Sequence, residues 1–231
     1  MADAFELPRR AMAIFAHPDD VDFGCSGTIA LWTAQGVHVT YCLLTSGNKG
    51  THDPKMTPER ISAIREKEQR EAGRRAGASE FVFLRHDDGE LEVGMDLRAE
   101  VCKAIRVHKP DLVFCQDPWR TYQMHPDHRV AGWSALDGVI AARDHLFFPE
   151  QLTKGLSHHR VSRVLLFGTA DPNLWFDISS TMPKKLDALA AHESQVGQFS
   201  KLADRMNAFA AATGKAWGLE KAEAFRYLEL A

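Results

Sequence analysis

Two tetrapeptides of nearly the same sequence carry the side chains with the clearest capacity for chemistry. His17-Pro18-Asp19-Asp20 lies near the N-terminus, and His125-Pro126-Asp127-His128 follows about a hundred residues later. Each motif places two potential metal ligands three positions apart, with a proline that fixes the backbone between them. Histidine and aspartate are ligands typical of a catalytic zinc, which takes three protein ligands and leaves one position for water. Together the two motifs predict the ligand chemistry of a metal-dependent hydrolase.

Each motif by itself also has a purely structural interpretation. The aspartates of the first motif could cap the N-terminus of a helix, and the proline of the second could occupy the first position of a helix. This interpretation weakens when both motifs occur in one chain and each follows a predicted strand. We therefore expect the two motifs to form one site.

The elements that must position these motifs alternate between apolar runs and segments of helical period. The apolar and β-branched runs predict strands at 11–16, 37–45, 81–84, 111–115 and 161–169, with an edge strand at 175–178. The segments of helical period, with their proline and glycine boundaries, predict helices at 26–35, 58–76, 97–108, 127–144, 182–192 and 195–211. The stretch from Lys215 is amphipathic, and we expect it either to cap the fold or to contribute to an interface.

Alternating strands and helices predict an α/β fold: a Rossmann-like, mostly parallel sheet with helices on both faces, in a single domain over residues 1–231. Ligands of such sheets bind at the carboxyl ends of the strands. The first motif follows its strand directly, and the second follows the strand at 111–115 after a short loop. Both motifs are therefore expected at the same edge of the sheet.

Composition narrows the class of protein further. The 231 residues carry a formal net charge of -3 with acids and bases interspersed, so no basic stripe for nucleic acid is expected. The apolar runs are too short to span a membrane, and the N-terminus shows no signal-peptide pattern. The four cysteines show no CxxC spacing and are expected as free thiols. These features predict a reduced, cytoplasmic protein that acts on a small molecule, and they leave a homo-oligomer open.

The chain resembles a known family at the two motifs and at a series of weaker landmarks between and after them. Ala16-His17-Pro18-Asp19-Asp20, with Gly24 and Gly27-Thr28-Ile29, resembles the opening signature of the LmbE-like, or PIG-L-type, zinc-dependent N-acetyl deacetylases. The further landmarks, in the order of that family, are 45–50, 65–68 with Ala72, Ala76 and Gly77, 88–89, 110–113, the second motif and 192–195. The resemblance covers residues from about 11 to 196.

This resemblance implies roles for the residues of both motifs. It implies one Zn²⁺ per chain, held by His17, Asp20 and His128. Asp19 would be the general base that takes a proton from the attacking water. His125 would stabilise the oxyanion or protonate the leaving amine, and Asp127 would tune its charge. The chemistry of the residues agrees, because zinc acidifies water to a pKa of about 7 and an imidazole is well suited to donate a proton to nitrogen.

The residues on the substrate side are less specific. Arg65 and Asp88 match family positions that bind a polar, sugar-like substrate. Their alternatives are a solvated Arg65 paired with Glu68 or Gln69 and an ordinary turn at Asp88-Gly89.

The chain also departs from the family pattern. Val21 stands where many members carry glutamate. Gln123 stands where some carry a tyrosine that helps to stabilise the transition state. Tyr122 or Gln123 could take that role, or Tyr122 could join Trp119 in an aromatic wall.

The resemblance implies a hydrolase that removes an acetyl group from the nitrogen of a small polar substrate, with an N-acetylglucosamine-containing sugar or glycoside as the leading expectation. One alternative is an amidase of the same fold that acts on a non-sugar or thiol-conjugate amide. Another is a non-catalytic metal- or sugar-binding protein, although binding alone would need neither Asp19 nor His125. The same ligand set would also accept Fe²⁺.

Overall fold

A seven-stranded sheet in the order β3-β2-β1-β4-β5-β7-β6 forms the centre of the molecule. The computed structural model describes residues 5–230. The strands are β1 (Arg10–Phe15), β2 (His38–Thr45), β3 (Glu80–His86), β4 (Leu112–Gln116), β5 (Arg163–Phe167), β6 (Leu174–Asp177) and β7 (Ala222–Glu229). The first five strands pair in parallel, and β7 runs antiparallel to both β5 and β6. The predicted α/β fold with a mostly parallel sheet is confirmed.

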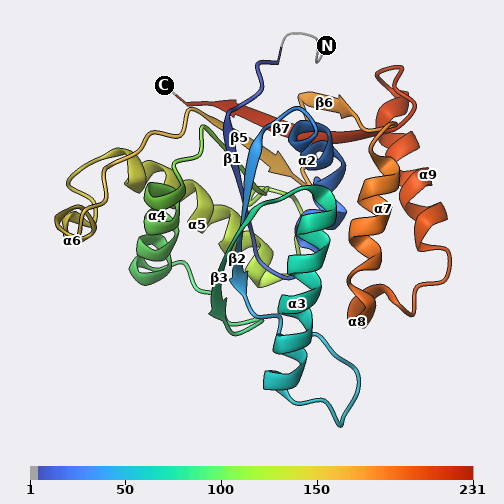
Figure 1. Ribbon diagram of the computed structural model, residues 1–231, viewed down its shortest axis with the longest axis horizontal. Helices are drawn as coiled ribbons and strands as arrows, with labels where there is room; N and C mark the ends of the chain where they lie inside the picture. Colours follow the sequence, from blue (N-terminus) through green and yellow to red (C-terminus); the bar gives the residue numbers. More distant parts are fainter. Residues whose placement is uncertain (1–4, 231) are drawn as a thin grey trace.

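Helices cover both faces of this sheet (Figure 1). One layer contains α4 (Met95–His108), α5 (Pro126–Arg143) and the short α6 (Pro149–Thr153). The other contains α2 (Ser26–Thr33), α3 (Pro58–Ala76) and α7 (Met182–Ala190), flanked by α8 (Glu193–Val196) and α9 (Leu202–Lys215). The remaining helix, α1 (Asp20–Gly24), follows β1 after the first motif.

Two apolar cores, one on each face, hold these layers together. Alternate residues of β1 point to opposite faces, so that Ala13 and Phe15 enter one core and Met12 and Ile14 enter the other. The first core includes Trp32 of α2, and the second packs against α4 and α5. The central strands are buried on both faces, which explains why they are continuous apolar runs in the sequence.

The C-terminal third differs most from the prediction. A single helix over 195–211 is wrong: α8 ends at Val196 and α9 begins at Leu202, because Lys201 adopts a left-handed φ of 64° that a helix cannot contain. The stretch after Lys215 contributes β7 to the sheet, between β5 and β6, rather than an amphipathic cap. Its alanines, glutamates and leucine favour a helix locally, and only pairing with distant strands makes the segment extended.

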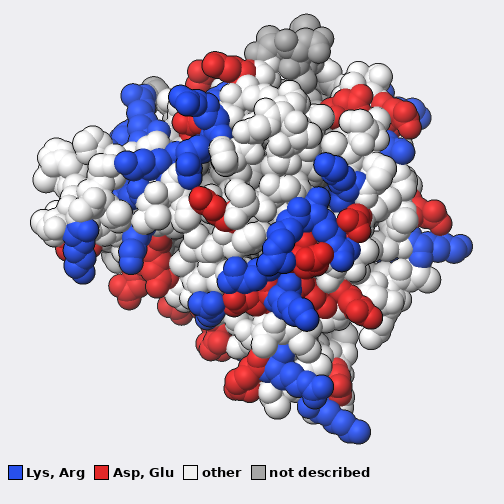
Figure 2. Space-filling view, viewed as in Figure 1, with Lys and Arg blue, Asp and Glu red and all other residues white. Residues whose placement is uncertain are grey.

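The surface over α3 carries charges of both signs. Figure 2 shows blue and red side chains interspersed across this region. Several of them form ion pairs, including Arg70 with Glu66 at 2.9 Å and Arg75 with Glu71 at 3.0 Å. Within residues 5–230, no helix combines the length and the apolar character needed to cross a membrane.

Candidate active site

The two His-Pro-Asp motifs meet at the carboxyl edge of the sheet, as predicted. β1 and β4 are hydrogen-bonded neighbours, with Ile14 opposite Cys115. The first motif joins β1 to α1, and the second motif begins α5 with its proline in the first turn. Residues more than a hundred positions apart in sequence are therefore brought to one point by strand pairing.

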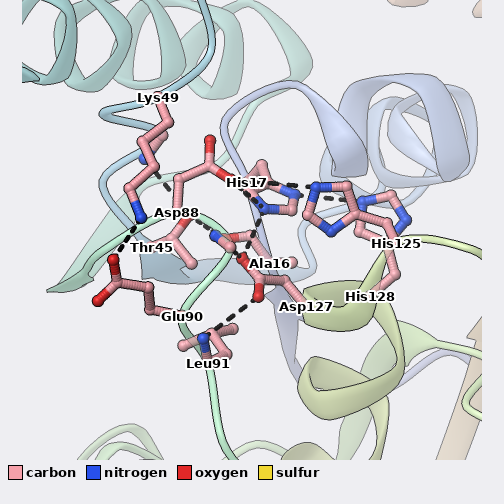
Figure 3. Close-up of polar contacts among 12 residues, drawn as sticks. Ala16, His17, Thr45, Lys49, Asp88, Glu90, Leu91, His125, Asp127 and His128 are labelled. Atoms are coloured by element: carbon pink, nitrogen blue, oxygen red, sulfur yellow. Dashed lines mark hydrogen bonds and ion pairs between the residues drawn. The ribbon is translucent and has the colours of Figure 1, made fainter.

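His17 lies at the centre of the site, between two carboxylates and the imidazoles of the second motif (Figure 3). Its Nε2 is 2.9 Å from Asp127 Oδ2 and 3.2 Å from Asp88 Oδ1. Its Nδ1 faces the opposite way, 3.2 Å from His128 Nε2 and 3.4 Å from Asp20 Oδ2. An ionised Asp127 can only accept a hydrogen bond, so Nε2 of His17 carries a proton, and Nδ1 is the nitrogen at which a metal ion would replace a proton.

The three residues expected to hold a metal form a compact set of donors. His128 Nε2 is 3.1 Å from Asp20 Oδ1 and 3.2 Å from His17 Nδ1. A tetrahedral ion with bonds of about 2.0–2.1 Å separates its donors by about 3.3–3.4 Å. His17 Nδ1 and His128 Nε2 approach different oxygens of Asp20, at 3.4 and 3.1 Å. Each contact is close to that requirement, and the residues therefore fit a small tetrahedral cation.

Two other groups of potential ligands overlap this triad. His125 joins His17 and His128 in one group, and Asp88 and Asp127 join His17 in the other. The second group fits a metal less well, because Asp127 already accepts backbone hydrogen bonds from Gly89 at 2.6 Å and Leu91 at 3.2 Å. A carboxylate occupied in this way is better suited to orient His17 than to bind an ion.

The charges around His17 favour a cation at this position. Burial acts to lower the pKa of His17, but hydrogen bonds to Asp127, Asp20 and Asp88 outweigh it and raise the pKa to about 11. Burial acts to raise the pKa of Asp20, but hydrogen bonds from His128 and His17 hold it well below its usual range. The site therefore stabilises a positive charge strongly, as a metal-binding pocket must.

Asp19 occupies a strained position beside this triad. Its φ of 90° is in the left-handed region, and its backbone N–H donates to Gln69 Oε1 at 2.8 Å. Burial, together with the negative charge of Asp20, raises the pKa of Asp19 to about 7, although Arg65 and His192 act in the opposite direction. A carboxyl group with such a pKa can accept a proton near neutral pH.

His125 is more open than His17 and His128, with its side chain 41% exposed. Burial and the nearby His17 and His128 lower the pKa of His125. Asp127 was expected to tune the charge of His125. Its hydrogen bond goes to His17, but its negative charge, like that of Asp88, acts to raise the pKa of His125. The sequence could not show that Asp127 pairs with His17, because only folding brings residues 110 positions apart together.

Arg65 is buried, so the alternative of a solvated residue paired with Glu68 or Gln69 is wrong. Its guanidinium donates to the carbonyl of Pro18 at 2.9 Å and to that of Gly47 at 3.1 Å, and only 4% of the residue is exposed. It also lies 3.5 Å from Asp19 and 3.7 Å from Asp88. A Cβ on Gly50 would come within 2.1 Å of the guanidinium, so a larger residue there would displace the end of the Arg65 side chain.

The remaining candidates separate into buried and exposed residues. Asp88 is buried against His17, so it is more than an ordinary surface turn. Tyr122 is 91% exposed, and Trp119 packs against Trp133 with 57% of its surface exposed. Gln123 lines a cavity beside Asp20 and His128. Of the two candidates for the tyrosine of other members, Gln123 is therefore the one that lies at the site.

Sequence reasoning missed the polar residues that hold the motifs in place. Gln116 donates to Asp20 at 3.1 Å, and Gln69 donates to Asp22 at 2.8 Å. Asp22 also pairs with His192 at 2.9 Å. Two signals existed in the sequence. Gln116 directly follows the strand predicted at 111–115, and Gln69 lies four residues after Arg65 on one helix face.

Comparison with known proteins identifies the family. The model of the family described as PIG-L, GlcNAc-PI de-N-acetylase, matches residues 12–137, which include both His-Pro-Asp motifs. The chain belongs to the PIG-L family. The resemblance drawn from the sequence is thus confirmed, and PIG-L proteins are deacetylases that act on amide bonds.

Similar proteins extend the match beyond residue 137. Diacetylchitobiose deacetylase from Thermococcus kodakarensis is 35% identical over 193 residues, covering 84% of this chain and 72% of the relative. A Bacillus anthracis protein named probable N-acetyl-alpha-D-glucosaminyl L-malate deacetylase 2 is 29% identical, covering 81% of each chain. The structure of N,N'-diacetylchitobiose deacetylase from Pyrococcus horikoshii superposes with a TM-score of 0.92 at 32% identity, covering 97% of this chain and 88% of the other.

Proposed function

We propose that this chain is a metal-dependent deacetylase that removes the N-acetyl group from a small molecule containing N-acetylglucosamine. The observation that carries the proposal is the donor triad of His17, Asp20 and His128 beside the buried carboxyl group of Asp19. The relatives named for diacetylchitobiose and for an N-acetylglucosaminyl malate support the substrate class.

His17 Nδ1, Asp20 and His128 Nε2 would hold the metal, and zinc suits this mixed nitrogen and oxygen set. When bound, the ion would polarise the amide carbonyl and acidify the attacking water. Iron(II) would bind the same donors. Metal analysis of protein purified without added metal distinguishes the two ions.

The surrounding residues would divide the proton transfers. Asp19 would accept a proton from the attacking water, and its position beside the triad supports this role. His125 would donate a proton to the leaving amine or a hydrogen bond to the oxyanion. Asp127 would orient His17, Asp88 and Arg65 would contact or position the sugar, and Gln123 would contact the substrate beside Asp20 and His128.

Acetate release from N-acetylglucosamine, diacetylchitobiose and related glycosides tests the proposal. Zinc-loaded protein should release acetate, and Asp19→Asn should retain zinc and lose at least roughly a hundredfold in kcat, the scale of general-base catalysis. Asp87→Asn is the matched control, because Asp87 is an exposed aspartate beside Asp88. Zinc bound at one per chain without acetate release from any sugar would instead favour a non-sugar amidase or a binding protein.

We further propose a reducing compartment such as the cytoplasm as the location of the protein. The support is that Cys25, Cys42, Cys102 and Cys115 are all buried free thiols. Association into a homo-oligomer stays a prediction, and light scattering during size-exclusion chromatography measures it.

A further inference from the structure

A cavity of about 590 Å³ opens beside Asp20 and His128 and continues away from the His-Pro-Asp motifs. It lies between α1, the loop after β4, the connection from β5 to β6, strand β7 and helix α9. Its volume falls within the range of about 300–1,000 Å³ typical of pockets for whole small molecules. The methyl group of an acetyl substituent would leave most of it unfilled.

The walls of this cavity are mainly apolar. Aromatic and aliphatic side chains from five different segments line it: Phe23, Phe167, Trp175, Ile178, Met206 and Phe209. The buried charges at its base neutralise each other, since Lys185 Nζ and Glu223 Oε1 are 2.6 Å apart. Arg120, which also lines the cavity, is exposed. Gln116, Asp117 and Gln123 also line the cavity, and Gln116 lies next to the donor triad, 3.1 Å from the carboxylate of Asp20. The apolar walls bind hydrocarbon and offer no hydrogen-bond partners to the hydroxyl groups of a sugar.

The cavity lies on one side of the donor triad, and the polar residues Arg65 and Asp88 lie on the other. Arg65 and Asp88 gather near Asp19 and the Nε2 edge of His17, and neither lines the cavity. Asp20 and His128, which face the Nδ1 edge of His17, form the mouth of the cavity. The carbonyl carbon of an amide at the triad has two substituents besides its oxygen. One is the nitrogen that carries the sugar, and the other is the acyl chain. With the sugar beside Arg65 and Asp88, the acyl chain points into the cavity.

We propose that this cavity binds the acyl chain of the substrate. The protein then prefers an amino sugar with a medium-length aliphatic N-acyl group over one with an acetyl group. The inference rests on the proposed function and specifies its acyl group. The reaction is the same hydrolysis: one water is consumed, the acyl carbon–nitrogen bond breaks, a carbon–oxygen bond forms, and the products are a fatty carboxylate and the protonated amine.

Kinetics on N-acetyl-, N-butanoyl- and N-octanoylglucosamine test the proposal. One buried methylene group is worth roughly fourfold in binding, so kcat/KM should rise by at least about tenfold from acetyl to octanoyl. Activity on acetyl that equals or exceeds activity on octanoyl would overturn the acyl-chain site and leave the deacetylase function intact. Lack of activity on all three would count against the proposed function itself.

Binding of the carboxylate product supplies a readout that does not depend on turnover. Isothermal titration with octanoate and acetate should give at least about tenfold tighter binding of octanoate. Equal affinities would contradict the proposal even if the protein proved inactive on sugars. Failure of the acyl-chain site can thereby be distinguished from failure of the proposed function.

A matched pair of exposed phenylalanines tests the location. Phe209 lines the cavity on α9, whereas Phe199, which is similarly exposed, does not line it. Phe209→Glu should lower the ratio of octanoyl to acetyl kcat/KM by about tenfold, because it places a carboxylate against the chain. Phe199→Glu should leave the ratio unchanged.

If Phe209→Glu lost the same factor in kcat/KM on the octanoyl and acetyl substrates, the cavity would not be the acyl-chain site, provided that circular dichroism shows a folded protein. A preference for the octyl glycoside of N-acetylglucosamine over N-octanoylglucosamine would also overturn the assignment, because the cavity would then hold the aglycone.

Discussion

At the scale of single residues, the orientation of His17 depends on Asp127. The carboxylate is fully buried, accepts the Nε2 proton of His17 at 2.9 Å, and is itself fixed by the backbone N–H groups of Gly89 and Leu91. This arrangement leaves Nδ1 free to bind a cation. Partners of this kind fix the tautomer of a metal-binding histidine and raise its basicity.

Asp127→Asn should therefore weaken zinc binding by about 10- to 100-fold. The amide keeps the shape of the side chain and removes the negative charge that favours the Nε2 proton. Competition with a chromogenic chelator measures the affinity. Unchanged zinc affinity in the variant would show that Asp127 does not act through His17.

Gln69 has a comparable role toward Asp19. Its amide bridges the backbone N–H of Asp19 and the carboxylate of Asp22, and no part of the residue is exposed. A left-handed residue other than glycine costs of order 1–3 kcal/mol and persists only where the surroundings hold it. Gln69 is thus the group that keeps Asp19 aimed at the site.

Gln69→Leu should retain stoichiometric zinc and lower kcat by up to roughly a hundredfold, because a small displacement of a catalytic group is costly. Elemental analysis and steady-state kinetics measure the two quantities, with the exposed Gln35→Leu as the control. If the zinc content fell in proportion to the activity, Gln69 would instead act by supporting the metal ligand Asp20.

At the scale of elements, one buried ion pair joins three segments distant in sequence. Glu223 of β7 accepts hydrogen bonds from the backbone of Gly27 and Thr28 at the N-terminus of α2, and from Lys185 of α7 at 2.6 Å. Lys185 also donates to the carbonyls of Asp22 and Phe23 in α1. A carboxylate at a helix N-terminus is favoured by the helix dipole, so the pair secures α1 and α2 behind the site.

Lys185→Met should lower the free energy of unfolding by about 3–5 kcal/mol, because Glu223 would remain buried without a countercharge. Adding Glu223→Gln should recover part of the loss, since the neutral amide needs no countercharge. Urea denaturation of the two variants and the parent chain measures this. A double variant no more stable than Lys185→Met would mean that packing, and not charge, is lost.

At the scale of the whole molecule, the donor triad connects the first strand to the middle of the chain. His17 and Asp20 follow β1, and His128 lies in α5. A ligand that binds only the folded state stabilises it by mass action. The site should therefore couple metal binding to global stability.

Saturating zinc at a hundred times its Kd should add about 2.7 kcal/mol to the free energy of unfolding, which raises Tm by roughly 5–11 °C for a chain of this size. A chelator should reverse the increase. Asp20→Ala should abolish the response to zinc while it keeps the apo Tm within a few degrees. Differential scanning calorimetry provides the measurement, and a full response in Asp20→Ala would exclude Asp20 as a ligand.

The features of this protein that follow local residue patterns could be predicted from the sequence. The parallel core strands are continuous apolar runs, α3 has its proline start and glycine stop at the predicted residues 58 and 77, and both motifs follow predicted strands. The residue types of the two motifs were enough to indicate a metal site at the carboxyl edge of the sheet, because parallel strands end at the same edge.

The partner of each polar group depends on how distant segments pack together. Asp127 could have paired with either His125 or His17, and strand pairing places it on His17. Arg65 and Gln69 have an ordinary helical surface pattern, yet both are buried beneath the first motif. The stretch after Lys215 became β7 because two distant strands offer hydrogen bonds to it. The cavity beside the triad is also formed by segments far apart in the chain. Contacts of this kind depend on long-range packing, which local residue preferences do not encode.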